Sequence, residues 1–337
     1  MTLFIRRMRK LGRDPVGYLL DSTHAPLRAL GARLYANETE RFRKLGQAAS
    51  DRKVSVIMTA FNTGHLIERA VKSVLAQSHR NLELMVIDDA SSDDTAAILA
   101  EMAAEDDRLR VFSSPANHGT YWSKNWCLTK ATGEFVAFHD SDDYSDPDRL
   151  RVQMGALLAD PSQMACTCRW RRVNEAGELQ LIDGAEERMA AISLMIRRAP
   201  VLEQAGYFDT VRIAADTEYI RRLKEIFGWK GVRHLRQCLY TGLLREGSLT
   251  TDVGSGFDWQ RKGNSHSRAV GGNRAAYYDA FTNWHSACGG DRGKLSVSFP
   301  ARSRPFDVPT DMVRGCNDDD LTQVVELGAS LPQTARG

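Results

Sequence analysis

Short apolar segments alternate with amphipathic ones from Val54 to Asp140, and this alternation constrains the fold more than any other feature of the chain. The apolar segments predict buried strands at 54–58, 82–87, 109–112 and 134–139, and the amphipathic ones predict helices at 65–77, 95–104 and 121–131. Such alternation indicates a mainly parallel sheet flanked by helices. We therefore expect the α/β fold class, built on one central sheet.

Composition limits the classes of partner. The 337 residues are 42% hydrophobic, which suffices for a large core with appendages, and no run approaches the length of a transmembrane helix. The formal net charge is only +2, and the basic residues do not interleave with aromatic ones, so no nucleic-acid partner is expected. Six cysteines are scattered without a C-x-x-C pair, and the N-terminus lacks a signal-peptide core. A reduced, cytoplasmic location is therefore expected.

The loops that follow the predicted strands are polar and meet at one edge of the sheet, because right-handed crossovers bring the carboxyl ends of parallel strands together. That edge collects Thr59, Phe61, Asn62, Asp88, Asp89, Asp140 and Asp142. The first strand is followed by Thr-Ala-Phe-Asn-Thr-Gly rather than G-x-G-x-x-G, and a P-loop is absent as well. A dinucleotide-binding oxidoreductase therefore loses its main evidence.

The acidic segment at 138–148, FHDSDDYSDPD, is the part of the chain that best suits a metal ion. Asp140 and Asp142 follow an apolar strand, and their hard carboxylate oxygens suit Mg²⁺ or Mn²⁺. A solvated acidic loop is the alternative. A calcium EF-hand does not fit, because a loop opening at Asp140 places Ser145 where the turn glycine belongs and Arg151 where the bidentate glutamate belongs.

Five ordered stretches resemble the family 2 glycosyltransferases, which are inverting nucleotide-sugar enzymes of the GT-A fold. They are 54–62 (VSVIMTAFN), 86–93 (VIDDASSD), 117–134 (with NHG, KN and ATGE), 140–150 (DSDD, then PDRL) and 206–222 (with GYFD and DTEYIRR). Five motifs in order are far more specific than a lone D-x-D. The resemblance spans about residues 53 to 251 and implies a GT-A domain there.

The resemblance implies a donor site at the strand ends. Thr59, Phe61 and Asp89 take the positions that hold the nucleotide base, with Asp89 accepting a uracil N–H, so a UDP-sugar is the expected donor. Asp88 is expected to be its structural neighbour or a helix cap. Lys124 stands where the family commonly has a basic residue, and we expect it to meet the nucleotide.

The resemblance also implies a metal site. Asp142 is expected to be the principal ligand of Mn²⁺ or Mg²⁺, and Asp140 a metal ligand or a contact to the ribose or to metal-bound water. The metal would neutralise the diphosphate as it leaves. Many relatives carry a histidine shortly before a Ser-Leu-Thr-like segment, whereas this chain has Leu244-Arg-Glu-Gly-Ser-Leu-Thr250, so a third protein ligand is in doubt. Arg245 is expected to grip the diphosphate instead, with a surface arginine as the alternative.

An inverting transfer needs a carboxylate that takes the proton from the attacking acceptor hydroxyl. The resemblance assigns this role to Asp216, with Glu218 in reserve. The alternative is that Asp216 and Glu218 form ordinary helix-surface pairs with Arg221 and Arg222 at i, i+4 spacing.

The chain divides into three predicted parts, which are a basic helical extension at 1–52, the GT-A domain at 53–251, and an extension at 252–337 that packs on the catalytic domain. The final segment, after about Asp311, is expected to be a weakly ordered end or a short helix. Aromatic residues in the last part are expected to serve packing rather than sugar stacking. Within the first part, Arg6, Arg7, Arg9, Lys10 and Arg13 lie among apolar residues. A helix there would either pack on its own domain or make peripheral contact with the inner face of an anionic membrane.

These expectations add up to a metal-dependent, inverting hexosyl- or N-acetylhexosaminyltransferase. The segments at 10–15 and 19–22 resemble a short element of bacterial capsule and surface-polysaccharide transferases, which implies a glycan or lipid-linked glycan as the acceptor. The rival interpretation is a non-catalytic GT-A scaffold in a polysaccharide assembly complex. A nucleotidyltransferase is a further alternative, but it usually carries a Gly-rich basic loop where this chain has Asn62-Thr63-Gly64.

Overall fold

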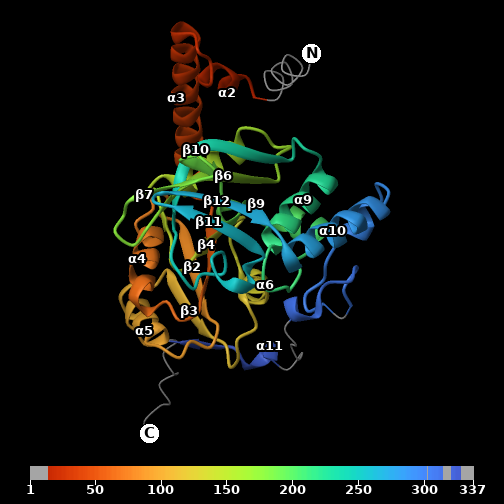
Figure 1. Cartoon of the computed structure of the whole chain (residues 1–337). Helices are drawn as coiled ribbons and strands as arrows, with labels where there is room; N and C mark the ends of the chain where they lie inside the picture. Colours follow the sequence, from red (N-terminus) through yellow and green to blue (C-terminus); the bar gives the residue numbers. More distant parts are fainter. Residues whose placement is uncertain (1–13, 302, 314–319, 328–337) are drawn as a thin grey trace.

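Parallel strands form the centre of the molecule (Figure 1). The computed structural model describes residues 14–301, 303–313 and 320–327. Every residue of the first two strands is buried, as expected for strands covered on both faces. The predicted α/β class with a mainly parallel sheet is confirmed. The four parallel strands stand in the order β3-β2-β1-β4, and their bounds are β1 Val54–Ala60, β2 Leu82–Asp88, β3 Leu109–Ser113 and β4 Phe135–Asp140.

Three helices connect these strands, and they agree with the predicted helices to within two residues at each end. Ile67, Val71 and Val74 of the first helix are fully or almost fully buried, so the apolar face found by periodicity is the face that packs on the sheet. The bounds of the helices are α4 Gly64–Leu75, α5 Thr95–Glu105 and α6 Thr120–Lys130.

The sheet continues beyond β4 with antiparallel and mixed pairing. β9 (Met195–Arg197) runs antiparallel to both β4 and β6, and β10 runs parallel to β6. A hairpin of β11 and β12 closes the far edge through β7. The remaining bounds are β5 Tyr144–Ser145, β6 Ala165–Val173, β7 Leu179–Ile182, β8 Glu187–Met189, β10 Val232–Leu243, β11 Phe257–Lys262, β12 Ser265–Val270, α7 Arg149–Leu158, α8 Arg198–Ala205, α9 Ala215–Phe227 and α10 Gly272–Ala287.

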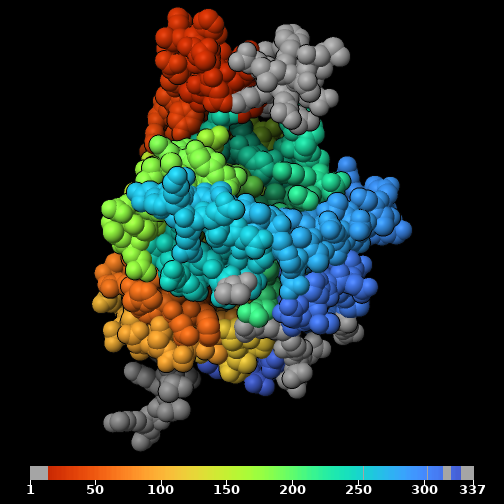
Figure 2. Space-filling model, in the orientation of Figure 1, coloured from red at the N-terminus to blue at the C-terminus, as the bar shows by residue number. Residues whose placement is uncertain are grey.

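The N-terminal extension is helical where it is described, with α2 at Pro15–Leu20 and α3 at Ala25–Ala48. The end of α3 packs on α7, where a Cβ at Gly155 would overlap the carbonyl oxygen of Phe42. The rest of α3 stands out from the body of the molecule (Figure 2). The basic segment at 6–13 lies outside the described residues. Of the helices in the described ranges, none combines the length and the hydropathy needed to cross a bilayer.

The C-terminal extension is built into the fold. Residues 320–327 belong to the segment expected to be a weakly ordered end or a short helix. They form the short helix α11 (Asp320–Gln323) and the strand β13 (Val325–Leu327), and β13 pairs antiparallel with β3. Glu326 accepts two hydrogen bonds from Arg110, at 2.8 and 3.0 Å. Sequence periodicity missed this strand because its partner is the open edge of β3, which offers unpaired backbone groups to any segment that reaches it. The rest of the expected end, 314–319 and 328–337, lies outside the described residues.

The guanidinium of Arg149 holds the end of β4 in place. Arg149 is 1% exposed and belongs to the PDRL stretch that follows the D-x-D. Its nitrogens donate to the carbonyl oxygen of Phe138 at 2.7 Å, to Gln153 Oε1 at 2.9 Å and to Ser145 Oγ at 3.0 Å. The cation also lies 4.9 Å from the centre of the Tyr240 ring. One buried side chain therefore joins β4, β5, α7 and β10 directly beneath the acidic segment.

Replacing Arg149 with methionine should lower the free energy of unfolding by about 3 kcal/mol, because three buried acceptors lose their donor. Urea denaturation followed by circular dichroism measures the change. The matched control is Lys72→Met, since Lys72 is 65% exposed and pairs only with an exposed glutamate; it should shift stability by less than about 0.5 kcal/mol. Equal unfolding midpoints for the two variants would show that the buried hydrogen bonds contribute nothing.

Candidate active site

A cleft of about 510 Å³ opens at the carboxyl ends of the parallel strands. Binding clefts of open α/β sheets occur at this edge. Eight of the residues singled out from the sequence come from the end of β1, the loop after β2, α6, the end of β4, α9 and the loop after β10, and the fold brings these eight to one cleft. Its lining includes Thr59, Phe61, Asp89, Lys124, Asp140, Asp142, Asp216 and Arg245. Their individual roles remain predictions.

The end of the cleft near β1 and β2 is held by side-chain hydrogen bonds. Thr59 Oγ1 lies 2.7 Å from Thr120 Oγ1, at the start of α6. The carboxylate of Asp89 accepts the backbone N–H groups of His118 and Gly119, at 2.9 and 2.8 Å. Gly119 has φ of 92°, a conformation that favours glycine. Asp89 thus fixes the turn that leads into α6 while it faces the cleft.

Asp88 and Asp89 have different surroundings. Asp88 accepts the backbone N–H and the hydroxyl of Ser91 and closes the tight turn after β2. It does not line the cleft. Burial raises the pKa of both carboxyls, and their hydrogen bonds oppose that rise. The expectation that Asp88 is a structural neighbour agrees with this geometry.

The two aspartates of the D-x-D each have a basic partner. Lys124 Nζ lies 3.3 Å from Asp140 Oδ1, and Arg245 Nε donates to Asp142 Oδ2 at 3.0 Å. The backbone N–H of Asp140 donates to the Tyr240 hydroxyl at 3.1 Å, which fixes the turn. Burial and the neighbouring charge of Asp140 raise the pKa of Asp142, while Arg245 acts in the opposite direction. Arg245 therefore contacts the acidic segment rather than solvent.

Asp143, which follows the D-x-D, has a structural role. It is 4% exposed, and its carboxylate accepts the backbone N–H of Leu243 at 2.8 Å. Burial raises its pKa well above the ordinary aspartate range. It joins the acidic segment to the end of β10.

The carboxylates of Asp140 and Asp142 fit a divalent cation that takes its other ligands from substrate and water. In the described part of the chain, no group of three or more His, Cys, Asp or Glu side chains is arranged to hold a metal ion. Mg²⁺ and Mn²⁺ sites are commonly completed by substrate phosphates after one or two carboxylates. The described residues therefore offer no third protein ligand for the metal. The side chain beside Asp142 is that of Arg245, which is itself positively charged.

Asp216 faces the cleft from the first turn of α9. The residue that precedes the helix, Ala214, has φ of 71°, which is uncommon for a residue with a Cβ. Asp216 is half-buried, and its Oδ1 accepts the backbone N–H of Thr217 at 2.7 Å. Among the described residues it has no ion-pair partner within 4.0 Å, so the surface-pair alternative does not apply to it. A carboxylate in this setting remains available to accept a proton.

Glu218 lies two residues further along α9 and faces the interior. Glu218 and Arg222 are both fully buried, and Arg222 Nε and Nη2 donate to the carboxylate at 2.8 and 2.9 Å. His285 Nε2 lies 3.0 Å from the same carboxylate. Arg222 also donates to the carbonyl oxygens of Ala205 and Tyr207. Glu218 does not line the cleft, which argues against it as the reserve base, and the expected i, i+4 pair is buried rather than on the surface.

Replacing Glu218 with glutamine should make stability less sensitive to acid. Burial raises the pKa of Glu218, but Arg222 and His285 together bring it below the ordinary value. A lowered pKa stabilises the fold above the ordinary glutamate range, and that stabilisation is lost as pH falls through the folded value. We expect a loss of about 3 kcal/mol at neutral pH and a flatter stability curve below about pH 5.

Urea midpoints between pH 3 and 7 measure both effects. Asp216→Asn serves as the control for the same helix turn, because Asp216 faces the cleft, and at pH 7 it should lose less stability than Glu218→Gln. A Glu218→Gln variant as stable as the wild type would contradict the buried ion pair.

Sequence reasoning missed several residues that line the cleft. They come from β6, the loop before α9, α6 and the C-terminal extension, and no spacing in the sequence connects them. Tyr278 is an aromatic residue of the last part that faces the cleft, whereas Tyr277 and Trp284 pack in the interior as expected. The missed residues include Tyr121, Trp170, Arg172, Arg212, Arg268 and Arg274.

Part of this chain is similar in sequence to known glycosyltransferases. Residues 55–213 match the model of the family described as Glycosyl transferase family 2. The chain is 41% identical over 106 residues to the putative glycosyltransferase EpsE of Bacillus subtilis, covering 31% of this chain and 38% of that protein. It is 37% identical over 108 residues to WfgD of Escherichia coli, named as a UDP-Glc:alpha-D-GlcNAc-diphosphoundecaprenol beta-1,3-glucosyltransferase, covering 32% of this chain and 42% of that protein. The matches thus span about two fifths of these relatives.

Two solved structures are similar over part of the chain. The crystal structure of S. aureus TarS 1-349 in complex with UDP has a TM-score of 0.47 and 23% identity, covering 57% of this chain and 60% of that one. The mannosyltransferase PcManGT from Pyrobaculum calidifontis, in complex with GDP-Man and Mn2+, has a TM-score of 0.47 and 19% identity, covering 64% of this chain and 68% of that one.

Proposed function

We propose that this chain, whose residues 55–213 match the model of glycosyl transferase family 2, transfers a sugar from a nucleotide-diphosphate donor to a hydroxyl of a glycan, with inversion. One observation carries the proposal. The D-x-D aspartates, Asp89 and Asp216 line a single cleft whose volume suits a nucleotide sugar. A bare acidic loop on the surface would not gather these groups.

The donor is proposed to be a UDP-sugar. Its base would lie at the end of the cleft near Thr59, Phe61 and Asp89, where Phe61 is 48% exposed and offers a ring face for stacking. Asp89 would accept the uracil N–H with the lone pairs that its two backbone donors leave free. The name of the E. coli relative includes UDP-Glc, which supports this choice of donor.

Mn²⁺ or Mg²⁺ is proposed to bind at Asp142, with Asp140 beside it. When bound, the metal would stabilise the charge of the departing diphosphate. Lys124 and Arg245 are well placed to contact the same diphosphate, because both already lie at the D-x-D. Their charges would then serve the donor phosphates as well as the aspartates.

Asp216 is proposed as the general base. In an inverting transfer, the acceptor hydroxyl attacks the anomeric carbon from the side opposite the leaving diphosphate, while a carboxylate takes its proton. Asp216 enters the cleft from α9, on a different element from the D-x-D of β4. The bond to the diphosphate breaks as the new glycosidic bond forms, and the diphosphate keeps the electron pair.

The acceptor is proposed to be a growing or lipid-linked glycan of a bacterial surface polysaccharide. The diphosphoundecaprenol glycan in the name of the E. coli relative supports this class. Such an acceptor would require access at the cytoplasmic face of a membrane. Hexosyl and N-acetylhexosaminyl donors are both candidates for the sugar that is transferred.

UDP release tests the proposal. The purified chain is incubated with a panel of UDP-sugars and an extract of lipid-linked glycans, with Mn²⁺ or with EDTA. We expect metal-dependent turnover of one donor. Asp216→Asn should reduce turnover by about 10² to 10⁴-fold, as expected for the loss of a general base, while UDP binding measured by calorimetry stays unchanged. In Asp142→Asn, turnover with Mn²⁺ should be no higher than turnover with EDTA.

Asp107→Asn is the matched control, because Asp107 is an exposed aspartate in the turn before β3 and does not line the cleft. It should retain full activity. Failure of the wild-type chain to bind any nucleoside diphosphate would refute the transferase and favour the scaffold interpretation. UDP binding that is unaffected by Asp142→Asn, with or without metal, would refute the proposed metal site.

A further inference from the structure

Arginines without carboxylate partners line one wall of the cleft. Arg172 of β6, Arg268 of β12 and Arg274 of α10 all border it. Within the described residues, none of the three has a carboxylate oxygen within 4.0 Å, unlike Lys124 and Arg245 at the D-x-D. Positive charges gathered without counter-charges attract an anionic ligand.

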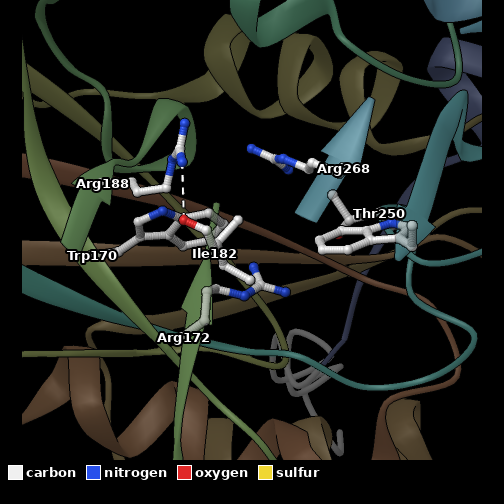
Figure 3. A pocket seen from close by; sticks show the side chains of 7 residues that line it. Trp170, Arg172, Ile182, Arg188, Thr250 and Arg268 are labelled. Atoms are coloured by element: carbon white, nitrogen blue, oxygen red, sulfur yellow. Dashed lines mark hydrogen bonds between the residues drawn. The ribbon is translucent and has the colours of Figure 1, made fainter. Parts of the chain in front are cut away.

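A small pocket opens from this wall. The pocket and the cleft have four lining residues in common, which are Trp170, Arg172, Thr250 and Arg268. Its volume is about 10 Å³, which is room for about one oxygen-sized group. Figure 3 shows arginine side chains that enter the pocket from three sides, with Trp170 opposite Thr250. The full lining is Trp170, Arg172, Ile182, Arg188, Thr250, Trp259 and Arg268.

Arg268 is the principal candidate contact. It faces Trp259 directly across the β11–β12 hairpin, and its guanidinium carbon lies 4.4 Å from the centre of the Phe257 ring. The carboxylate of Asp183 pairs with Arg188 at 2.8 Å, and it accepts the backbone N–H of Arg268 at 3.0 Å rather than a guanidinium N–H. Burial lowers the pKa of Arg268, and the charges of the neighbouring arginines lower it further, which Asp183 offsets only in part. The Arg268 guanidinium thus lies against aromatic rings, and no carboxylate of the described residues pairs with it.

Arg172 provides a second hydrogen-bond donor for an anionic ligand. It is 7% exposed, and its guanidinium carbon lies 4.4 Å from the centre of the Trp170 ring. One nitrogen donates to the carbonyl oxygen of Leu243 at 2.7 Å, but the buried Nε has no hydrogen-bond partner among the described residues. Buried donors of this kind are costly unless a ligand satisfies them. Its charge also acts on Asp142 and Asp143, so Arg172 stands between the D-x-D and the pocket.

We propose that this pocket binds an anionic oxygen of the acceptor saccharide, from a sugar carboxylate or a sugar phosphate, with Arg268 and Arg172 as the donors. The inference rests on the proposed glycosyltransferase function and adds the acceptor class to it. The pocket takes the charged oxygen, and the sugar ring lies in the adjoining cleft. Trp170 lines both the pocket and the cleft, so its ring borders the position of the sugar, and aromatic faces suit the C–H faces of sugars.

The topology favours the acceptor over the donor as the source of this anion. The sheet order is β12-β7-β6-β9-β4-β1-β2, so the pocket lies on the opposite side of β4 from the strands that border the proposed nucleotide site. The donor diphosphate is expected at the D-x-D, on β4 itself. A ligand group in the pocket would therefore lie beyond the diphosphate, on the side of the cleft that β11 and β12 of the C-terminal extension build.

Binding of simple anionic sugars tests the inference. The full chain, saturated with UDP and Mn²⁺, is titrated with methyl glucuronide, with glucose 1-phosphate and with neutral methyl glucoside. Calorimetry gives the affinity, and tryptophan fluorescence gives a second readout, because two tryptophans line the pocket. At least one anionic sugar should bind about tenfold or more tightly than methyl glucoside, as expected for a charge-assisted contact.

Arg268→Gln should remove this preference for the anionic sugar, and Arg268→Lys should restore only part of it, because lysine lacks the planar fork. UDP affinity should stay unchanged in both variants. Arg261→Gln is the matched control from the same hairpin, since Arg261 is 41% exposed, pairs with exposed Glu246 and does not line the pocket. It should keep the wild-type preference.

Each other outcome has a definite meaning. Tighter binding of methyl glucuronide identifies a carboxylate as the natural group, and tighter binding of glucose 1-phosphate identifies a phosphate. Equal binding of neutral and anionic sugars by the wild type overturns the inference while leaving the transferase proposal intact. An Arg268→Gln variant that loses UDP affinity also overturns it, because the arginines would then serve the donor diphosphate. Absence of UDP binding by the wild type would instead overturn the proposed function.

Discussion

A buried guanidinium holds together the part of the molecule on which the cleft depends. Within the described residues Arg149 has no carboxylate partner, and its charge is stabilised by a backbone carbonyl, a hydroxyl, an amide and the ring of Tyr240. Burying a charge is costly unless its hydrogen bonds are all made, so these groups must stay together. Because Tyr240 also accepts the backbone N–H of Asp140, the same cluster determines where the acidic segment turns away from the sheet.

The charges of the cleft are arranged in two different ways. At the D-x-D, each acidic group has a basic partner, so the local charge is nearly balanced. A diphosphate with a divalent cation carries charges of both signs, and it can therefore contact the aspartates through the metal and the basic residues through its oxygens. Along the wall of β6 and β12, by contrast, Arg172 and Arg268 have no carboxylate partner within ion-pair distance in the part of the chain that the structure describes. The two regions are thus suited to ligands of different net charge.

The C-terminal extension contributes to the cleft although its sequence resembles none of the quoted motifs. Asp209, in the GYFD stretch, accepts hydrogen bonds from Arg304 and Tyr277, and the N–H of Tyr207 donates to the carbonyl oxygen of Val297. A Cβ on Gly206 would overlap that same oxygen of Val297. These contacts hold the segment that leads into α9, and hence Asp216, against residues that lie between 68 and 95 positions further along the chain. The predicted boundary between the GT-A domain and the C-terminal extension is therefore a feature of the sequence, because in the fold the two parts pack against each other.

The sequence alone determined the alternating elements, the parallel sheet and the edge at which the polar loops meet, because periodicity and strand-end polarity are local properties. It also identified the residues of the cleft that belong to ordered motifs. Only the tertiary structure could separate Asp216 from Glu218, since residues two apart on a helix point to nearly opposite sides and packing decides which side faces the interior. The arginine-lined wall likewise required the fold, because Arg172, Arg268 and Arg274 come from distant elements that share no local pattern.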